Sequence, residues 1–172
     1  DLIISVLLFF EFLSIFLFCS KTNWVSKLMK KNITPESAKK TETIGNGVDI
    51  IKNSRINSSL KIKGFLNRIY TKKEIQQGKK IKNKINFYAK RFAAKEAFVK
   101  AIGTGFRSDI NFIDIEIKNY KNGKPYISLS KKLNNFLKKK FKIQRYKVFL
   151  SLSDEKDYSI AFVVIDKKIW KK

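Results

Sequence analysis

The spacing of the apolar residues changes midway along the chain, and this change limits the fold more than any other feature of the sequence. In 60–69 and again in 86–102, apolar residues recur at the three- and four-residue intervals of a helix. After Ile113 they alternate with polar residues, which is the pattern of a half-buried strand. Helices followed by hairpins favour an α+β fold, with an antiparallel sheet and packed helices.

Turn and cap residues divide the first half into elements. The run 43–51 reads as a short strand, and its two glycines mark a place where another part of the chain approaches the backbone closely. Thr71 and Glu74 fit a capping box at the start of a new helix. Glycines at 103–105 are expected to end the helix predicted over 86–102.

The second half is predicted to hold two hairpins separated by a helix. Asn122-Gly123 favours a turn between strands at 113–117 and 126–129, and Pro125 places the second strand at an edge. A lysine-rich helix follows, whose apolar stripe consists of Leu133, Phe136, Leu137 and Phe141. The last hairpin joins strands at 148–152 and 159–165 through a polar turn at 154–157.

The composition excludes several classes of function. The 172 residues include no histidine and one cysteine, Cys19, which excludes a disulfide scaffold and every mechanism or zinc site that needs imidazole. The 38 Lys and Arg against 14 Asp and Glu give a net charge of +24. Such a charge attracts nucleic acid, acidic protein or anionic lipid without choosing among them.

The first 42 residues read as a targeting segment. Residues 2–18 are apolar but interrupted by Ser5, Glu11 and Ser14, and they are too short for a confident membrane span. A basic, hydroxyl-rich stretch follows at 21–43, as in a transit peptide. A secretory signal followed by such a stretch predicts import into an apicoplast-type plastid, with no stable membrane anchor after processing. A membrane anchor with a linker is the plainer alternative, and residues 43–172 are expected to form the folded domain.

Two acidic residues stand out as candidates for chemistry. Asp49 interrupts the apolar run 44–51, and an unpaired buried carboxylate costs several kcal/mol, so Asp49 must be exposed, paired or metal-bound. Glu96 lies on the alanine-rich helix and shares a face with Lys100. The plainer alternatives are a salt bridge from Asp49 to a lysine, and a Glu96–Lys100 pair that only stabilises its helix.

Together these residues predict a magnesium site that handles phosphate. Mg²⁺ takes one or two protein carboxylates, here Asp49 and Glu96, and completes its coordination with water and phosphates. Lys100 and Arg91 would lie nearby, and 103–105 would offer open backbone N–H groups to an anion. Transfer of a phosphoryl-linked group depends on positioning and charge neutralisation, so a chain without histidine can still be an enzyme.

Four segments resemble the holo-acyl-carrier-protein synthases, which are small trimeric 4′-phosphopantetheinyl transferases. They are IGNGVDIIKNSRI (44–56), RFAAKEAFVKAIGTG (91–105), DIEIKNYKNGKPYI (114–127) and VFLSLSDEKDYSIAFVVI (148–165). They run in the order of the family and span nearly all of 43–166, and the second is the most specific.

The resemblance implies a reaction and assigns the residues that catalyse it. Asp49 and Glu96 would bind Mg²⁺, and Lys100 would lie beside the phosphates of coenzyme A. The phosphopantetheine arm would pass to a serine of the apo-acyl carrier protein, in support of fatty acid biosynthesis, and adenosine 3′,5′-bisphosphate would be released. The serine proton would go to Glu96 or to a water on the metal.

The resemblance also implies binding surfaces. Each coenzyme site would lie between subunits of a homotrimer, lined by Arg91, Lys100, Gly103, Thr104, Gly105, Pro125 and Ser151. Arg55 would dock the acidic helix of the carrier protein, extended by Lys61, Lys63 and Arg68, although solvated helix faces explain these lysines equally well. The sequence departs from the family at Phe149 and Asp154, where bacterial relatives usually carry histidine.

Two other functions compete with the transferase. A nucleic-acid-binding protein would explain the charge and the lysine-rich helix at 131–140, but arginine is scarce and no interleaved aromatic–arginine motif is present, so nucleic acid is not expected as a partner. A membrane-associated structural protein would depend on residues 2–18 alone.

Overall fold

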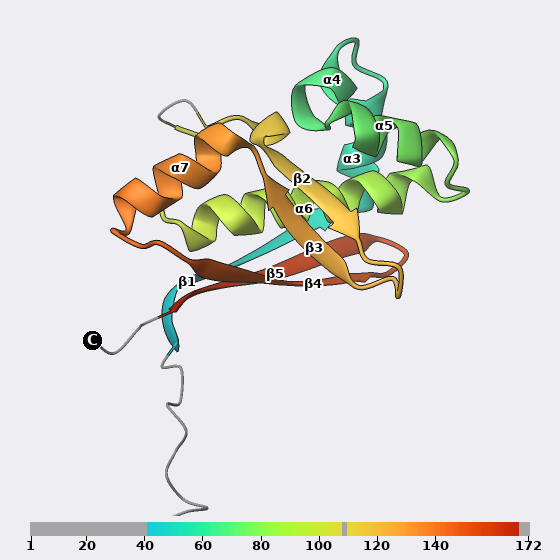
Figure 1. The fold of residues 1–172 in the computed structure, drawn as a ribbon. Helices are drawn as coiled ribbons and strands as arrows, with labels where there is room; N and C mark the ends of the chain where they lie inside the picture. Colours follow the sequence, from blue (N-terminus) through green and yellow to red (C-terminus); the bar gives the residue numbers. More distant parts are fainter. Residues whose placement is uncertain (1–40, 108–109, 169–172) are drawn as a thin grey trace, which may run out of the picture. The chain divides into compact units, whose positions relative to one another are not determined.

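The structure is a computed structural model that describes residues 41–107 and 110–168. Strands β1 (Thr41–Lys52), β5 (Tyr158–Lys168) and β4 (Tyr146–Asp154) form an antiparallel sheet in the order β1-β5-β4. Strands β2 (Ile115–Asn119) and β3 (Pro125–Leu129) form a separate antiparallel hairpin. The α+β class is therefore confirmed, although the antiparallel pairing is divided between two sheets (Figure 1).

The longest helix of the described residues, α6 (Lys84–Ala101), packs against strands of both sheets (Figure 1). Short helices α3 (Asn53–Leu60), α4 (Phe65–Ile69) and α5 (Lys72–Lys79) connect β1 to α6, a 3₁₀ turn η1 (Phe112–Asp114) precedes β2, and α7 (Lys131–Lys140) joins the two hairpins. Within the described residues, no helix has an apolar stretch long enough to cross a membrane. The expectations for residues 1–40 lie outside this part of the chain.

Glycines in β1 let that strand lie directly on α6. A Cβ placed on Gly47 would overlap the carbonyl oxygen of Ala97, and one placed on Gly45 would overlap that of Ala101. The close approach predicted for the two glycines is confirmed, and the neighbour is the alanine-rich helix. This contact fixes how Asp49 on β1 stands relative to α6.

A buried ion pair ties the short helices to α6. Lys95 Nζ donates hydrogen bonds to Glu74 Oε2 at 2.7 Å and to the carbonyls of Ile69 and Phe112, and both charged side chains are almost fully buried. Glu74 also accepts hydrogen bonds from the backbone N–H groups of Thr71 and Ile117. The capping box is confirmed, and the same carboxylate also joins α5 to β2.

The outer face of the three-stranded sheet is apolar, and it is exposed within the part of the chain that the structure describes. Val48 is paired with Phe162 and Ile50 with Ile160 on adjacent strands, and all four side chains are more than a third exposed. Phe149 and Tyr158 extend this face. Exposed apolar patches of this kind are typical of surfaces that bind a protein, a membrane or a ligand.

Three sequence expectations are corrected in detail. Residues 60–69 are not one helix, because Gly64 adopts a left-handed φ of 83° between α3 and α4. Ile113 belongs to η1, so β2 begins at Ile115. Asp154 is the last residue of β4 and not part of the turn. The hairpin turn is confirmed, with Gly123 at φ 85°, as is the helix α7.

Candidate active site

Asp49, Glu96 and Lys100 meet where β1 crosses α6. Lys100 Nζ lies 2.7 Å from Asp49 Oδ1 and donates a second hydrogen bond to the carbonyl of Val48 at 3.1 Å. Asp49 is mostly covered, with 15% of its side chain exposed, whereas Lys100 is 51% exposed. Asp49 was expected to be exposed, paired or metal-bound, and the structure shows it paired with a lysine. This ion pair joins β1, which carries Asp49, to α6, which carries Lys100.

The two carboxylates are close enough to influence each other. Burial raises the pKa of Glu96, the negative charge of Asp49 raises it further, and Lys100 acts in the opposite direction. The described residues contain no group of three or more His, Cys, Asp or Glu that could hold a metal. A pair of carboxylates suits Mg²⁺, which completes its coordination with water and phosphate.

Arg91 points to a different part of the molecule from Glu96. Five residues separate them on α6, which places them about 140° apart around the helix axis. The guanidinium stacks on the Phe87 ring, 3.5 Å from its centroid, and Nη2 lies 3.4 Å from Asn119 Oδ1. The expected position of Arg91 beside the carboxylate pair is thus corrected, because helix geometry turns it away.

Arg91 lines a cavity of about 550 Å³, called here the Arg91 cavity. Its lining combines three cations, four amides, two apolar side chains and one acid, namely Lys80, Lys90, Arg91, Gln77, Asn83, Asn86, Asn119, Ile81, Phe87 and Asp154. Burial lowers the pKa of Arg91 to about 10, so its guanidinium stays charged at neutral pH. The cavity is suited to an anionic ligand that also forms hydrogen bonds.

Asp154 is bound to other residues of the Arg91 cavity. Its carboxylate lies 2.6 Å from Lys90 Nζ and accepts a hydrogen bond from Asn86 Nδ2 at 2.8 Å. Burial alone would raise the pKa of Asp154, but these hydrogen bonds and the charge of Lys90 lower it overall. Asp154 is therefore ionised at neutral pH.

The buried side chain of Asn53 fixes the turn that follows Asp154. Its Nδ2 donates to the carbonyls of Glu155 and Lys156 and to Asn86 Oδ1, while its Oδ1 accepts from Ser159 Oγ. The backbone N–H of Asn53 donates to the Asp157 carbonyl at 2.7 Å. Four of these hydrogen bonds hold the start of α3 to the β4–β5 hairpin, and the fifth joins it to Asn86 on α6.

The segment after α6 leaves free space around its two glycines, but the expectation of open backbone N–H groups is corrected in part, because the N–H of Gly103 donates to the Lys100 carbonyl at 3.0 Å and that of Thr104 to the Val99 carbonyl at 3.3 Å. Gly103 and Gly105 adopt left-handed φ angles of 67° and 61°, and a Cβ on either would meet no atom within 4 Å. Among the described residues, two buried side-chain polar atoms have no hydrogen-bond partner, and they are Thr104 Oγ1 and Arg91 Nε. Both belong to residues predicted to bind the coenzyme.

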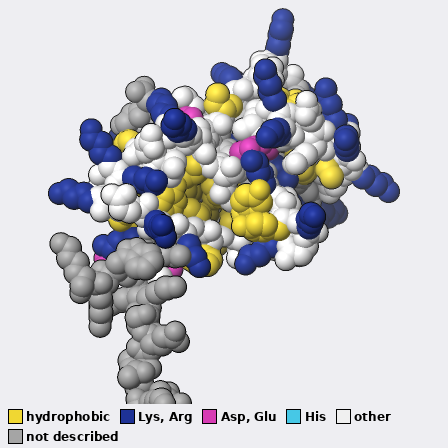
Figure 2. Space-filling view, viewed as in Figure 1, with side chains coloured by type: hydrophobic (Ala, Val, Ile, Leu, Met, Phe, Trp, Pro, Cys, Tyr) yellow, Lys and Arg dark blue, Asp and Glu magenta, His cyan; other side chains and the backbone are white. Residues whose placement is uncertain are grey.

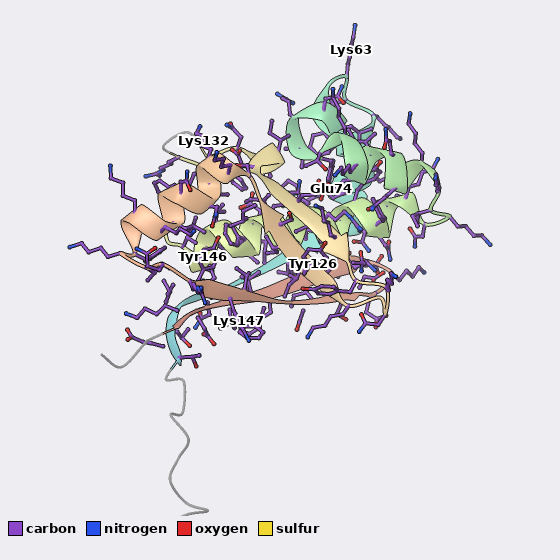
Figure 3. The ribbon with its side chains drawn as sticks, viewed as in Figure 1. Lys63, Glu74, Tyr126, Lys132, Tyr146 and Lys147 are labelled. Atoms are coloured by element: carbon purple, nitrogen blue, oxygen red, sulfur yellow. The ribbon has the colours of Figure 1, made fainter. Side chains whose placement is uncertain are left out.

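Pro125 and Ser151 lie elsewhere on the chain. Pro125 lines a cavity of about 660 Å³ to which neither Asp49 nor Glu96 contributes. This cavity is also lined by Tyr126, Tyr146 and Lys147, which come from β3 and β4 (Figure 3). In Figure 2 hydrophobic side chains gather in the hollow between α7 and β3, with lysine and arginine side chains around it. Ser151 is exposed opposite Phe162 on the apolar outer face.

The residues expected to dock a partner are exposed on α3, on α4 and between them. Arg55 lies on α3 and Arg68 on α4, while Lys61 and Lys63 belong to the connecting segment. Lys63 points away from the molecule (Figure 3). Ile62, which is 56% exposed, adds an apolar side chain to this basic surface.

Sequence reasoning missed Lys90, Asn86 and Asn53. Lys90 is next to Arg91, but its acidic partner Asp154 lies 64 residues further along the chain, so no local pattern indicates the pair. Asn53 follows Lys52 in an ordinary helix start, and its role depends on contacts with β4–β5 that only the fold reveals.

Comparisons with known proteins agree on one family. The model of the 4′-phosphopantetheinyl transferase superfamily matches residues 45–163. A holo-[acyl-carrier-protein] synthase from Pelagibacter ubique is 54% identical over 125 residues, covering 73% of this chain and 98% of that protein.

Two solved structures share the fold. The holo-[acyl-carrier-protein] synthase from Neisseria meningitidis is 39% identical, with a TM-score of 0.66 over 73% of this chain and 100% of that one. The enzyme from Bacillus anthracis, in complex with CoA, is 36% identical, with a TM-score of 0.61 over 73% of this chain and 98% of that one.

Proposed function

The chain belongs to the 4′-phosphopantetheinyl transferase superfamily, and from this premise we propose how its residues carry out the holo-[acyl-carrier-protein] synthase reaction. In this reaction a serine hydroxyl of the carrier protein attacks the β-phosphorus of coenzyme A. The phosphopantetheine arm is transferred, and adenosine 3′,5′-bisphosphate leaves. The attacking oxygen belongs to the partner, which agrees with a chain that has no histidine.

The observation that supports this function most directly is the meeting of Asp49, Glu96 and Lys100. Asp49 and Glu96 would hold Mg²⁺, which when bound neutralises charge on the diphosphate. Lys100 is half exposed and adjacent to Asp49, so its ammonium is available to stabilise the negative charge on the departing phosphate. We assign the serine proton to the Glu96 carboxylate, which is close to both Asp49 and Lys100.

The coenzyme would use the two unpartnered polar atoms of the described chain. Buried donors without partners are uncommon in folded proteins, and they indicate that a ligand or water completes the site. Arg91 lines a cationic cavity, and Thr104 lies between two glycines that have free space around them. Both features fit a donor that carries several phosphates.

We propose that the apolar outer face of the sheet closes a homotrimer. Val48, Ile50, Phe149, Ile160 and Phe162 would be covered by equivalent strands of the neighbouring subunits. Within one chain, Pro125 and Ser151 lie away from the carboxylates of Asp49 and Glu96. A coenzyme site formed between two subunits would explain how both residues could still bind the coenzyme. Light scattering of the purified protein gives the oligomeric state directly.

The basic surface of α3 and α4 would receive the carrier protein. Arg55, Lys63 and Arg68 are exposed around the apolar Ile62, which suits an acidic helix with one apolar side chain. Rim charges of this kind mainly raise the association rate. Reversing Arg55 and Arg68 to glutamate should therefore raise the KM for the carrier and remove most of its dependence on salt, with kcat little changed.

The deciding experiment is the conversion of an apo-acyl carrier protein. Incubation with coenzyme A and Mg²⁺ should add the mass of one phosphopantetheine group, and Asp49→Asn with Glu96→Gln should abolish this gain. Full conversion by the double variant would refute the assigned metal ligands. Tight binding of nucleic acid without any transfer would support the competing function.

We also propose that residues 1–42 direct the protein to a plastid of the apicoplast type. The proposal is supported by the apolar run followed by a basic, hydroxyl-rich stretch, and the family match begins only at residue 45. A fluorescent protein fused behind residues 1–42 should accumulate in that plastid in a suitable host. Diffuse fluorescence throughout the cytoplasm would contradict it.

A further inference from the structure

The Arg91 cavity contains one acidic side chain, and this side chain already neutralises one of its cations. Asp154 is the only acid among the lining residues, which include the cations Lys80, Lys90 and Arg91. The Asp154 carboxylate and the Lys90 ammonium are 2.6 Å apart, and their side chains are 27% and 29% exposed. The ion pair is therefore accessible to a ligand that enters the cavity.

The position of the carboxylate is fixed by the fold. Asn86 donates a hydrogen bond to Asp154, and Asn53 fixes both Asn86 and the turn behind it. Arg91 differs from Lys90, because within the described residues its guanidinium has no acidic partner and instead stacks on the Phe87 ring and donates to Asn119 Oδ1. In the part of the chain that the structure describes, the cavity thus offers a ligand two cations without an acidic partner, Lys80 and Arg91, and one, Lys90, that is already paired with Asp154.

We infer that Asp154 is a specificity-determining residue of the donor site, whose carboxylate occupies the position on Lys90 that a phosphate of coenzyme A would otherwise take. This inference rests on the proposed function, in which the cavity receives phosphate groups of the donor. An entering phosphate must displace the carboxylate from Lys90 or bind beside a like charge, and either event weakens binding. The released adenosine 3′,5′-bisphosphate carries phosphates of the same kind, so Asp154 also speeds its departure.

The test is the affinity of the full-length protein for coenzyme A, measured by titration calorimetry at fixed ionic strength. Asp154→Asn keeps the size of the side chain and an acceptor for Asn86, but it frees Lys90. The dissociation constant for coenzyme A should fall about two- to fivefold, the range of a partly exposed ion pair. In steady-state assays KM for coenzyme A should fall without a rise in kcat, because the gain is uniform binding.

Two further variants separate this role from a general charge effect and from a structural one. Glu155→Gln removes the same charge from the exposed neighbouring residue, which does not line the cavity, and should leave the affinity nearly unchanged. Lys90→Gln should weaken binding, and its combination with Asp154→Asn should restore affinity close to wild type, because the net charge of the cavity is then the same as in the wild type. A purely structural Asp154 would instead give weaker binding in Asp154→Asn.

An unchanged or higher dissociation constant in Asp154→Asn would overturn the inference, as would an equal gain from Glu155→Gln. These outcomes differ from a failure of the proposed function. If the wild-type protein binds coenzyme A but Asp154→Asn does not tighten it, only the inference about Asp154 is wrong. If the wild-type protein binds no coenzyme A, the proposed function and this inference are both wrong.

Discussion

Gly47→Ala should disable the enzyme by moving a helix, although Gly47 touches no substrate. The added Cβ would overlap the carbonyl oxygen of Ala97 and lie 2.7 Å from the Ala101 nitrogen. Both obstacles are backbone atoms, so no side-chain rotation removes the clash. β1 and α6 must therefore separate until the contact is acceptable.

The size of the effect follows from the required movement. Real Cβ atoms essentially never come within 3.0 Å of such atoms, so β1 and α6 must move apart by about 1 Å. Overpacking of this kind destabilises a protein by about 1–3 kcal/mol. Because Asp49 is on β1 and Glu96 on α6, the same movement separates the carboxylates, and a misplacement of about 1 Å can reduce catalysis on the order of 100-fold.

Two measurements and one control test this reasoning. Urea unfolding gives the loss of stability, and the rate of carrier-protein conversion at a temperature where the variant is folded gives the loss of activity. As a control, Asn46→Ala introduces alanine at the exposed position directly before Gly47 in β1. This variant should change neither the stability nor the activity by much. A folded Gly47→Ala variant with the wild-type rate would refute the link between this contact and the site.

Three further predictions concern other parts of the molecule. Lys95→Met leaves the buried Glu74 carboxylate unpaired and should lower the free energy of unfolding by about 3–5 kcal/mol in urea titrations, whereas the exposed Lys139→Met should change it little. Hydrogen bonds to Asn86 and Lys90 lower the pKa of Asp154 below its usual 3.8. The ionised carboxylate therefore stabilises the folded protein above pH 3.8, and this stabilisation is lost as the pH falls below that value. The difference in melting temperature between the wild type and Asp154→Asn should accordingly shrink below pH 3.8. Phe162→Lys places a charge at the centre of the apolar sheet face and should yield monomers in light scattering; a persistent oligomer would contradict the proposed interface.

Local signals predicted local structure well in this chain. The hydroxyl of Thr71 and the carboxylate of Glu74 satisfy backbone donors within a single turn, so the capping box could be predicted from four residues. The Asn122-Gly123 turn likewise depends on the conformational freedom of one glycine. The spacing of Glu96 and Lys100 predicted a shared helix face, and the motif predicted that Asp49 would be close to it.

Contacts between distant residues could not be predicted in this way. The sequence predicts only that Lys95 lies on the helix expected over 86–102, and its burial against Glu74 depends on how α5 packs on α6. The division of the strands into two sheets depends on which edges pair, and alternation within a strand carries no information about this. The Arg91 cavity combines residues from α5, α6, β2 and β4, so its cationic lining was invisible in the linear pattern.

The hydrogen bonds of Asn53 have a consequence for how the enzyme meets its two substrates. Arg55, on the surface proposed to receive the carrier protein, follows Asn53 by two residues, and the turn after Asp154 borders the cavity proposed to receive the donor. With four hydrogen bonds joining these segments, neither can shift alone. The surface proposed to bind the carrier protein and the cavity proposed to bind coenzyme A are thus both ordered when the chain folds. Binding of either substrate therefore does not carry the entropy cost of ordering these segments.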